Sequence, residues 1–368
     1  MIAAKLAPRT ALANGARWAR FVGWVLGLLL ACALCASVRW HEELRAWILP
    51  RQDVGWYVLF ALLLAIPARF TALAAAYVLE LLFVGWSRSS LRLLRRPDAS
   101  VKLDILAILV TLLVPSRHLG YLLSLGLLYL VDLYGLRHLN LSLTPLLPLW
   151  IFQTLCLLLL QSCVQYWLHR LHHSVPALWA LHQFHHSAER MSLLTSARQT
   201  ELTRGVEAIF FVLPAALLTT PTAAFPTADS PMFLVALVIL VYQVFVLING
   251  YLCHSSLTTG YGWLGRWLIV SPRMHRLHHA AAARYHDRNF GFDLVIWDRL
   301  FGTYIECEPE VDLNNLALGL ETNHFNRRGT LAGILREYFV TTYLLLWNEL
   351  RDSWRSRHHG AQMPFGEH

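Results

Sequence analysis

The sequence predicts an all-α fold, a multi-pass transmembrane helical protein that carries a histidine-rich helical cap. Three observations support this class. Hydrophobic residues make up 56% of the 368-residue chain, whereas charged residues make up only 15%, a balance above that of ordinary soluble domains. The hydrophobic residues gather in long blocks, several of them close to the length of a membrane helix. Half of the 18 histidines fall in three short boxes next to such blocks.

The hydrophobic blocks are predicted to form the membrane helices. They lie at residues 21–37, 54–87, 103–115, 121–135, 141–164, 206–219 and 231–250. A helix needs about 20 apolar residues to cross the bilayer core, and the first, fifth and last blocks reach or approach that length. Block 54–87 is long enough for two helices, and we expect a tight hairpin broken near Pro67 and Arg69. The shorter blocks fit half-spanning or re-entrant segments.

The net charge of +8 fits membrane contact and predicts no nucleic-acid partner. Basic residues flank the blocks, as Arg17 and Arg20 do before the first and Arg95 and Arg96 do after the second. This pattern is typical of cytoplasmic helix ends near anionic headgroups, and it predicts a cytoplasmic amino terminus. A cleaved secretory signal peptide at residues 1–37 is the alternative, although an uncleaved first helix is simpler.

The chain divides into three expected regions. Residues 1–140 are predicted to be N-terminal transmembrane helices with short basic connectors. Residues 141–305 contain all three histidine boxes and are predicted to be the functional core. Block 141–164 runs directly into the first box, and a new helix with the second box is expected after the interruption at Pro176. The third box is expected on a helix that starts at Ser271-Pro272. Residues 306–368 are predicted to be a C-terminal tail, partly helical and partly polar.

The three boxes of the form H-x-x-H-H carry the chemistry. They are His169-Arg-Leu-His172-His173, His182-Gln-Phe-His185-His186 and His275-Arg-Leu-His278-His279. Positions i, i+3 and i+4 of a helix share one face, so each box is predicted to aim three imidazoles in one direction. Neutral imidazole binds first-row transition metals well near physiological pH. Polar surface histidines would explain one box, but three boxes predict a pair of metal ions.

Iron is the expected metal, because two metals with open positions at a membrane surface suit dioxygen activation, and zinc has no accessible redox couple. Soluble di-iron proteins use mostly carboxylates in a Glu-x-x-His spacing. The nearby acids Glu189, Glu201 and Glu207 lack that spacing, so imidazole must dominate here. Two octahedral irons offer about 12 positions, which leaves room for further ligands. A zinc hydrolase is a distant alternative, since the chain has no H-E-x-x-H string.

Four strings give residues 145–305 a resemblance to the fatty acid hydroxylase / sterol desaturase superfamily. They are Tyr166-Trp-Leu-His169, Pro176-Ala-Leu-Trp179, Met274-His275, and Asn289-Phe-Gly291 with Trp297-Asp298-Arg-Leu-Phe301-Gly302-Thr303-Tyr304. The resemblance implies a fatty acid hydroxylase-like catalytic domain at residues 141–305. It also implies an integral membrane, non-haem di-iron oxygenase that acts on lipids, with its histidine clusters on the cytosolic side.

The resemblance also implies which histidines bind the two irons. The first family box, H-x-x-x-H, maps to His169 and His173, and a lone histidine after the second membrane hairpin maps to His254. The implied metal ligands and catalytic residues are His169, His173, His182, His185, His186, His254, His275, His278 and His279.

Four other residues are candidates for orienting a metal-binding histidine through a hydrogen bond: His172, His286, Asn289 and Asp298. Three of them have a plainer alternative. Asn289 fits a turn, Asp298 fits a local ion pair with Arg299, and His286 fits an interfacial position.

Two positions depart from the pattern of this superfamily. Many members carry an acid seven residues before the first box histidine, where this chain has Ser162. Many have an Arg-x-His-Pro string after the second box, where this chain has Arg198-Gln-Thr-Glu201. The Arg198-Gln199 pair resembles the branch that contains alkylglycerol monooxygenase. Both departures leave the nine mapped histidines intact, and they bear on the substrate.

The sequence therefore predicts an iron-dependent oxidoreductase that hydroxylates or desaturates a fatty acyl, sterol-like or ether lipid. Dioxygen and electrons from a cytochrome, ferredoxin or flavoprotein would be required. The alternative is a histidine-rich membrane metal-binding or metal-transport protein. A transporter would place metal-binding groups near the membrane midplane, whereas these boxes lie at helix ends.

All three boxes are expected on the cytoplasmic side of the membrane. Ligands of one site cannot be separated by about 30 Å of hydrocarbon. The neighbouring arginines agree with the positive-inside tendency; they are Arg170, Arg190, Arg198, Arg273 and Arg276.

Overall fold

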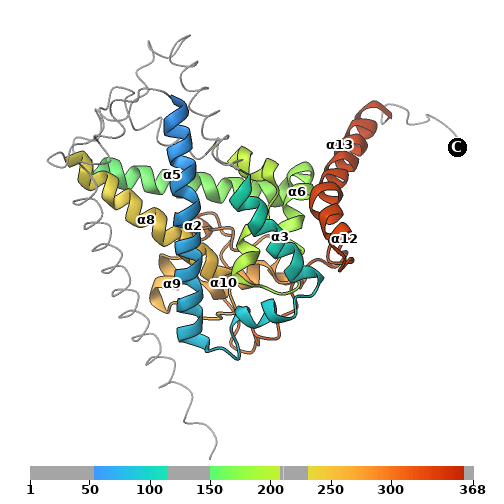
Figure 1. Ribbon diagram of the computed structural model, residues 1–368, viewed down its shortest axis with the longest axis horizontal. Helices are drawn as coiled ribbons and strands as arrows, with labels where there is room; N and C mark the ends of the chain where they lie inside the picture. Colours follow the sequence, from blue (N-terminus) through green and yellow to red (C-terminus); the bar gives the residue numbers. More distant parts are fainter. Residues whose placement is uncertain (1–53, 115–149, 208–209, 211–230, 360–368) are drawn as a thin grey trace, which may run out of the picture.

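The computed structural model describes residues 54–114, 150–207, 210 and 231–359, and these residues are helical or irregular, with two isolated β-bridges and no strand. The prediction of an all-α class is confirmed for this part of the chain. The longer helices are α2 (Val54–Val84), α3 (Ala99–Leu113), α5 (Trp150–Ser174), α6 (Pro176–His186), α8 (Pro231–Cys253) and α13 (Thr342–His359) (Figure 1). Shorter helices are α9 (Trp263–Trp267), α10 (Pro272–His278), α11 (Ile296–Leu300) and α12 (Leu331–Arg336).

Several predicted segments lie outside the described residues. These are the blocks 21–37 and 121–135, most of 206–219, and the candidate signal peptide. Among the helices that the structure describes, none combines the length and the apolar character needed to cross a bilayer.

The expected hairpin near Pro67 and Arg69 is wrong, because α2 runs without a break for 31 residues. A proline inside a helix removes one backbone hydrogen bond and strains the preceding turn. Packing of the following half offsets that cost. Ala72, Ala76 and Leu79 of α2 are buried in one cluster with residues of α8.

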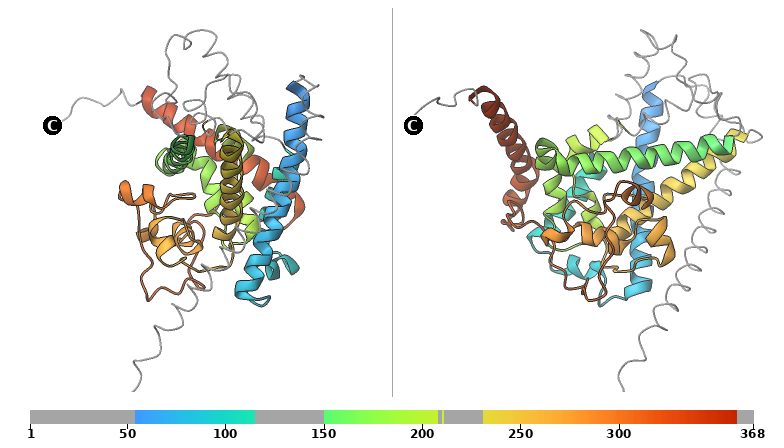
Figure 2. Two further views of the ribbon diagram at one scale, coloured as in Figure 1. Left: turned by 90° about the vertical axis from the view of Figure 1, so that its left-hand side faces the viewer. Right: turned by 180° about the vertical axis from the view of Figure 1, so that it is seen from behind.

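Helices α5 and α8 start close together and diverge towards the centre of the molecule, where α6 and α10 lie (Figures 1 and 2). As predicted, α5 continues from the apolar block through the first histidine box. A new helix, α6, then begins with Pro176 in its first turn. Helix α10 begins after Ser271, whose side chain accepts a hydrogen bond from the Met274 backbone N–H at 3.4 Å.

A second buried cluster joins the C-terminal region to the centre. Phe325 and Tyr338 pack against Phe184 of α6 and Leu103 of α3. Tyr338 belongs to a short π-helical segment, η6 (Glu337–Thr341), that joins α12 to α13. Residues 331–359 are therefore helical, and part of the C-terminal region packs on the helix that carries the second box.

Candidate metal centre

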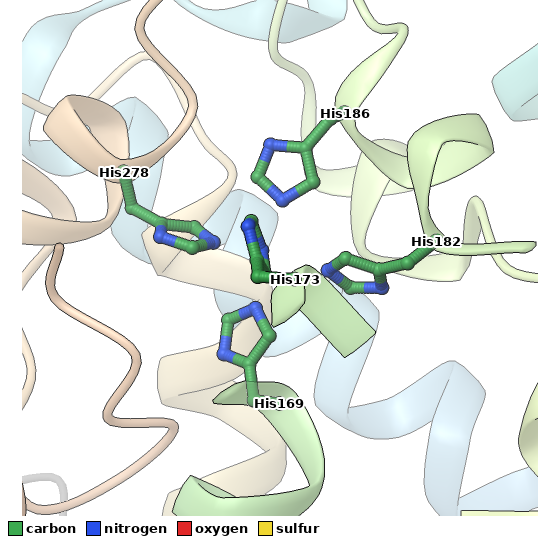
Figure 3. A group of neighbouring side chains, drawn as sticks. All are labelled: His169, His173, His182, His186 and His278. Carbon is green, nitrogen blue, oxygen red and sulfur yellow. The ribbon is translucent and has the colours of Figure 1, made fainter. Parts of the chain in front are cut away.

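The structure gathers the nine predicted histidines into two groups. The five-histidine group consists of His169, His173, His182, His186 and His278, and the four-histidine group consists of His185, His254, His275 and His279. Within each group, one ring nitrogen of every residue lies within 4.8 Å of the others. In the five-histidine group, rings from α5, α6 and α10 point towards a common centre (Figure 3). Two such groups are what a pair of metal ions requires.

Two of the three boxes are divided between the groups. His182 and His186 face one group while His185 faces the other, and the third box is divided in the same way. The expectation that each box aims three imidazoles in one direction is therefore wrong for these two boxes, and in the first box only His169 and His173 join a group. Helix positions i and i+3 differ by about 60° around the axis, enough to face adjacent sites. The groups are close neighbours, since the His186 and His279 rings stack at 4.4 Å.

Unpartnered nitrogens in the five-histidine group show that its residues fit a metal ion. The Nε2 atoms of His169, His173, His186 and His278 are buried and have no hydrogen-bond partner. The Nδ1 atom of His169 lies 2.7 Å from the Phe290 carbonyl, and that of His278 lies 2.8 Å from the Arg288 carbonyl. A carbonyl only accepts, so Nδ1 carries the proton and Nε2 keeps its lone pair. This orientation is typical of histidine that ligates a metal through Nε2.

Close contacts between ring nitrogens show that the four-histidine group also fits a metal ion. The Nε2 atom of His254 lies 3.2 Å from that of His185 and 2.9 Å from that of His275. The Nδ1 atoms of His254 and His185 face the Gly250 and Arg198 carbonyls at 2.7 and 3.3 Å, which assigns their protons to Nδ1. The Nε2 atoms of His254 and His185 then present lone pairs to each other, and these lone pairs repel. Two adjacent ligands about 2.1 Å from one octahedral ion stand roughly 3 Å apart, so a cation between them resolves the conflict.

Burial keeps these imidazoles neutral. It lowers the pKa of His254 to about 4 and that of His278 to about 3. Burial first, and then the neighbouring imidazoles, hold the pKa of His182 well below its ordinary value. Burial also lowers the pKa of His173, although the Asp287 carboxylate, 3.6 Å from its Nδ1, opposes the shift. Neutral imidazole is the form that binds a metal, so the site is ready for one near pH 7.

Asp298 fixes the backbone segment that orients the His169 ring. Its carboxylate accepts hydrogen bonds from the backbone N–H groups of Phe290 and Gly291, both at 2.7 Å. The Phe290 carbonyl is the group that accepts from His169. The alternative ion pair with Arg299 is wrong, because that guanidinium donates to the Arg266 carbonyl and stacks on aromatic rings instead.

Asn289 takes the turn role, one of its two predicted alternatives. Its φ of +55° lies in the left-handed region that asparagine tolerates. Its side chain accepts from the Ile305 backbone N–H at 2.9 Å and donates to the Ile305 carbonyl at 3.1 Å. These bonds close the loop before the Phe290 segment.

His172 and His286 lie outside both groups. His172 is buried and stacks on the His182 ring at a centroid distance of 5.1 Å, and its Nδ1 has no partner. His286 is exposed, and its ring contacts the Ala281 carbonyl at 3.1 Å.

Sequence reasoning missed a buried carboxylate beside Ser162. The Ser162 hydroxyl donates to Asp293, and so does the Tyr242 hydroxyl of α8. The Trp297 indole donates to the Ser162 oxygen at 2.9 Å. The position where related chains carry an acid therefore contacts an acid that comes from another segment. No motif marks Asp293, and only the fold brings it there.

Arg198 was also misread. With Arg276, it was expected to mark the cytoplasmic membrane surface, yet both side chains are buried in protein contacts. The Arg198 guanidinium pairs with Asp104, and that of Arg276 donates to the Leu313 carbonyl at 2.8 Å. Their charges therefore serve internal packing rather than a membrane surface.

A cavity of about 220 Å³ touches both histidine groups. His169 and His182 line it from the five-histidine group, and His185, His254 and His275 line it from the four-histidine group. Most of the remaining lining area is apolar, with side chains from α3, α5 and α8, but Arg69, Arg204 and Glu207 also line the cavity. The geometry offers a largely apolar space in contact with two candidate metal positions.

Comparison with known proteins agrees with this geometry. Residues 154–303 match the fatty acid hydroxylase family. This part of the chain is therefore similar to a fatty acid hydroxylase domain. The matched residues include every histidine of the two groups, together with Asp293 and Asp298.

The curated relatives match less than half of this chain. Alkylglycerol monooxygenase from Xenopus tropicalis is 33% identical over 146 residues, which are 40% of this chain and 29% of the relative. The protein of the same name from Homo sapiens is 34% identical over 39% of this chain and 28% of its own length. Ornithine lipid hydroxylase OlsE from Rhizobium tropici is 29% identical over 42% of each chain. The chain thus spans less than a third of the length of these alkylglycerol monooxygenases, and no solved structure matches it significantly.

Proposed function

We propose that the protein is a membrane-bound, non-haem di-iron oxygenase that hydroxylates a lipid. The observation that carries the proposal is the division of nine buried or half-buried histidines into two adjacent groups beside a largely apolar cavity. The named relatives, monooxygenases and lipid hydroxylases, support the reaction class. Alkylglycerols and acylated amino-acid lipids are the substrates to test first, because those names specify them.

In this proposal the five-histidine group would hold one iron and the four-histidine group would hold the other. A bound iron pair supplies the redox chemistry by which dioxygen attacks an unreactive C–H bond. The chain contributes fixed geometry: backbone carbonyls of Phe290, Arg288 and Gly250 hold three imidazole rings in one tautomer. The apolar cavity walls exclude water and place a lipid carbon near the metals.

The reaction also needs electrons, and we propose that a cytochrome, ferredoxin or flavoprotein supplies them. We further propose that the chain is a multi-pass membrane protein with both histidine groups on the cytoplasmic side. The hydrophobic blocks at 21–37 and 121–135 and their basic flanks support this topology. Cysteine residues introduced at positions 286 and 312 and labelled in intact vesicles would report on which side of the membrane these positions lie. Labelling only from the outer face would contradict the topology.

The decisive experiment is oxygen incorporation. Iron-loaded protein in lipid nanodiscs, supplied with a chemical reductant, ¹⁸O₂ and an alkylglycerol or an ornithine lipid, is expected to add one heavy oxygen to the lipid. Mass spectrometry separates this product from the loss of two hydrogens that desaturation would give. Protein that binds iron but turns over neither lipid, while carrying a metal ion across vesicles, would favour the transport alternative.

A further inference from the structure

One face of α5 carries a regular row of polar residues, two of which line the cavity. Gln161, Gln165, His169 and His173 stand four residues apart, a spacing that keeps side chains on one side of a helix. Two of them are members of the five-histidine group. Gln165 lies one turn before His169, and both line the cavity.

The two glutamines are not equivalent. The Gln161 carboxamide oxygen accepts a hydrogen bond from Gln243 of α8 at 3.0 Å, so it is used in the contact between the two helices. The Gln165 carboxamide oxygen is buried and has no hydrogen-bond partner. A buried acceptor without a partner is costly. The fold maintains this acceptor at the cavity wall, where an occupant could satisfy it.

The surroundings of Gln165 define that occupant. The cavity lining includes Leu168 of α5, Val246 and Leu247 of α8, and Phe292, all suited to hydrocarbon, beside polar side chains such as Gln243, Arg204 and Glu207. The volume of about 220 Å³ is below the roughly 300 Å³ of a small-ligand pocket, so it encloses part of a lipid. A carboxamide oxygen is neutral and only accepts, so it selects a hydroxyl or an amide N–H.

We propose that Gln165 is a specificity-determining residue that accepts a hydrogen bond from a hydroxyl or amide group of the lipid. This inference rests on the proposed function, because it takes the cavity as the substrate site. One helical turn is about 5.4 Å, so the donor group lies within a few bonds of the carbon beside His169. A lipid that lacks such a donor near its reacting carbon leaves the acceptor unpaired and binds more weakly.

The test compares two lipids that differ only in the donor. Hexadecylglycerol carries free hydroxyls, and its di-O-methyl ether has the same chain without them. Binding of each to the metal-free, full-length protein in detergent is measured by calorimetry. Wild-type protein is expected to bind the hydroxyl lipid about tenfold more tightly, as one satisfied buried acceptor allows.

The variant Gln165→Leu removes the acceptor at similar volume and is expected to reduce that preference to about one. Gln183→Leu is the matched control, because Gln183 lies on α6, donates to the Ala180 carbonyl at 3.3 Å and does not line the cavity. It should keep the wild-type preference. Should Gln165→Leu fail to fold, Gln165→Met, with a flexible side chain of similar size, decides by the same ratio.

An unchanged preference in the folded Gln165 variant, or no preference in the wild type, overturns the proposal. The binding ratio is independent of turnover, so the two proposals fail separately. A preference that depends on Gln165 without oxygen incorporation would refute the oxygenase and leave this assignment standing. Turnover of both lipids with no preference would refute this assignment and leave the oxygenase standing.

Discussion

Asp104 and Arg198 form a buried ion pair, with 3.1 Å between the Oδ1 and Nη1 atoms. The Arg198 main chain contacts His185, a member of the four-histidine group. The Asp104 and Arg198 side chains are both fully buried. The Arg198 carbonyl lies 3.3 Å from Nδ1 of His185, while its guanidinium also donates to the Phe184 carbonyl at 3.0 Å. The pair therefore ties α3 to α6 and fixes the carbonyl that orients His185.

Asp104→Asn is expected to lower the free energy of unfolding by about 3–5 kcal/mol, because it leaves the Arg198 charge buried and uncompensated. Thermal denaturation of the metal-free protein measures this loss. Arg190→Gln is the control, since it breaks an exposed pair with Asp98 at 3.2 Å, which contributes about 0–1 kcal/mol. Equal losses of unfolding free energy in the two variants would show that the buried pair stabilises the fold no more than the exposed pair does.

His275 and His278 are three residues apart on α10 but belong to different groups. Wild-type protein is expected to bind about two irons per chain, and His275→Ala and His278→Ala about one each, because each removes a ligand from one site. Elemental analysis after anaerobic iron loading measures the ratio. His286→Ala, at an exposed position outside both groups, should keep about two. Complete metal loss in either single variant would mean that the groups form one site.

The first box makes a sharper test, since His172 and His173 are adjacent. His173→Ala is expected to lower the iron content and abolish turnover, because His173 belongs to the five-histidine group. His172→Gln should keep its iron and much of its activity, because His172 stacks on His182 without joining either group. Iron content and product yield are measured on the same samples. The opposite pattern would reassign the ligand.

Asp298→Asn is expected to weaken iron binding at the five-histidine group about tenfold or more, since it disturbs the segment that orients His169. The asparagine NH₂ would face a backbone N–H, which loses one of the two hydrogen bonds. Competition against a chelator of known affinity measures the change. Asp312→Asn makes the same substitution at an exposed loop and should leave the affinity unaltered. Equal affinities in both variants would remove Asp298 from any orienting role.

Removing metal from the loaded protein should lower its thermal stability. Nine buried imidazoles converge in the folded chain only, so metal binding favours the folded state. Dialysis against a chelator is expected to lower Tm by several degrees, and iron readdition should restore it. A Tm that is independent of metal would indicate that the histidine groups do not bind iron under these conditions.

The sequence by itself determined the helical class, the continuity of α5 with the first box, the start of α6 at Pro176 and that of α10 after Ser271. These features depend on local patterns: hydrophobic runs, proline in the first turn and serine caps. Local patterns also marked the eight boxed histidines of the two groups, since imidazoles at i, i+3 and i+4 have few structural uses together. His254 came from the family resemblance alone. The break expected at Pro67 failed because packing between α2 and α8, invisible in local sequence, outweighed the local cost of proline.

Only the tertiary structure decided how those histidines divide. His185 and His186 are adjacent in sequence yet face different groups, and His254, which has no box of its own, completes one of them. The same holds for Asp104, Asp293 and Gln165, which no motif marks and which act through contacts 94 and 131 residues away or through a cavity. A helix fixes the direction of each side chain to within its own turn. The neighbouring helices decide whether a side chain contacts a ligand, an opposite charge or an apolar surface.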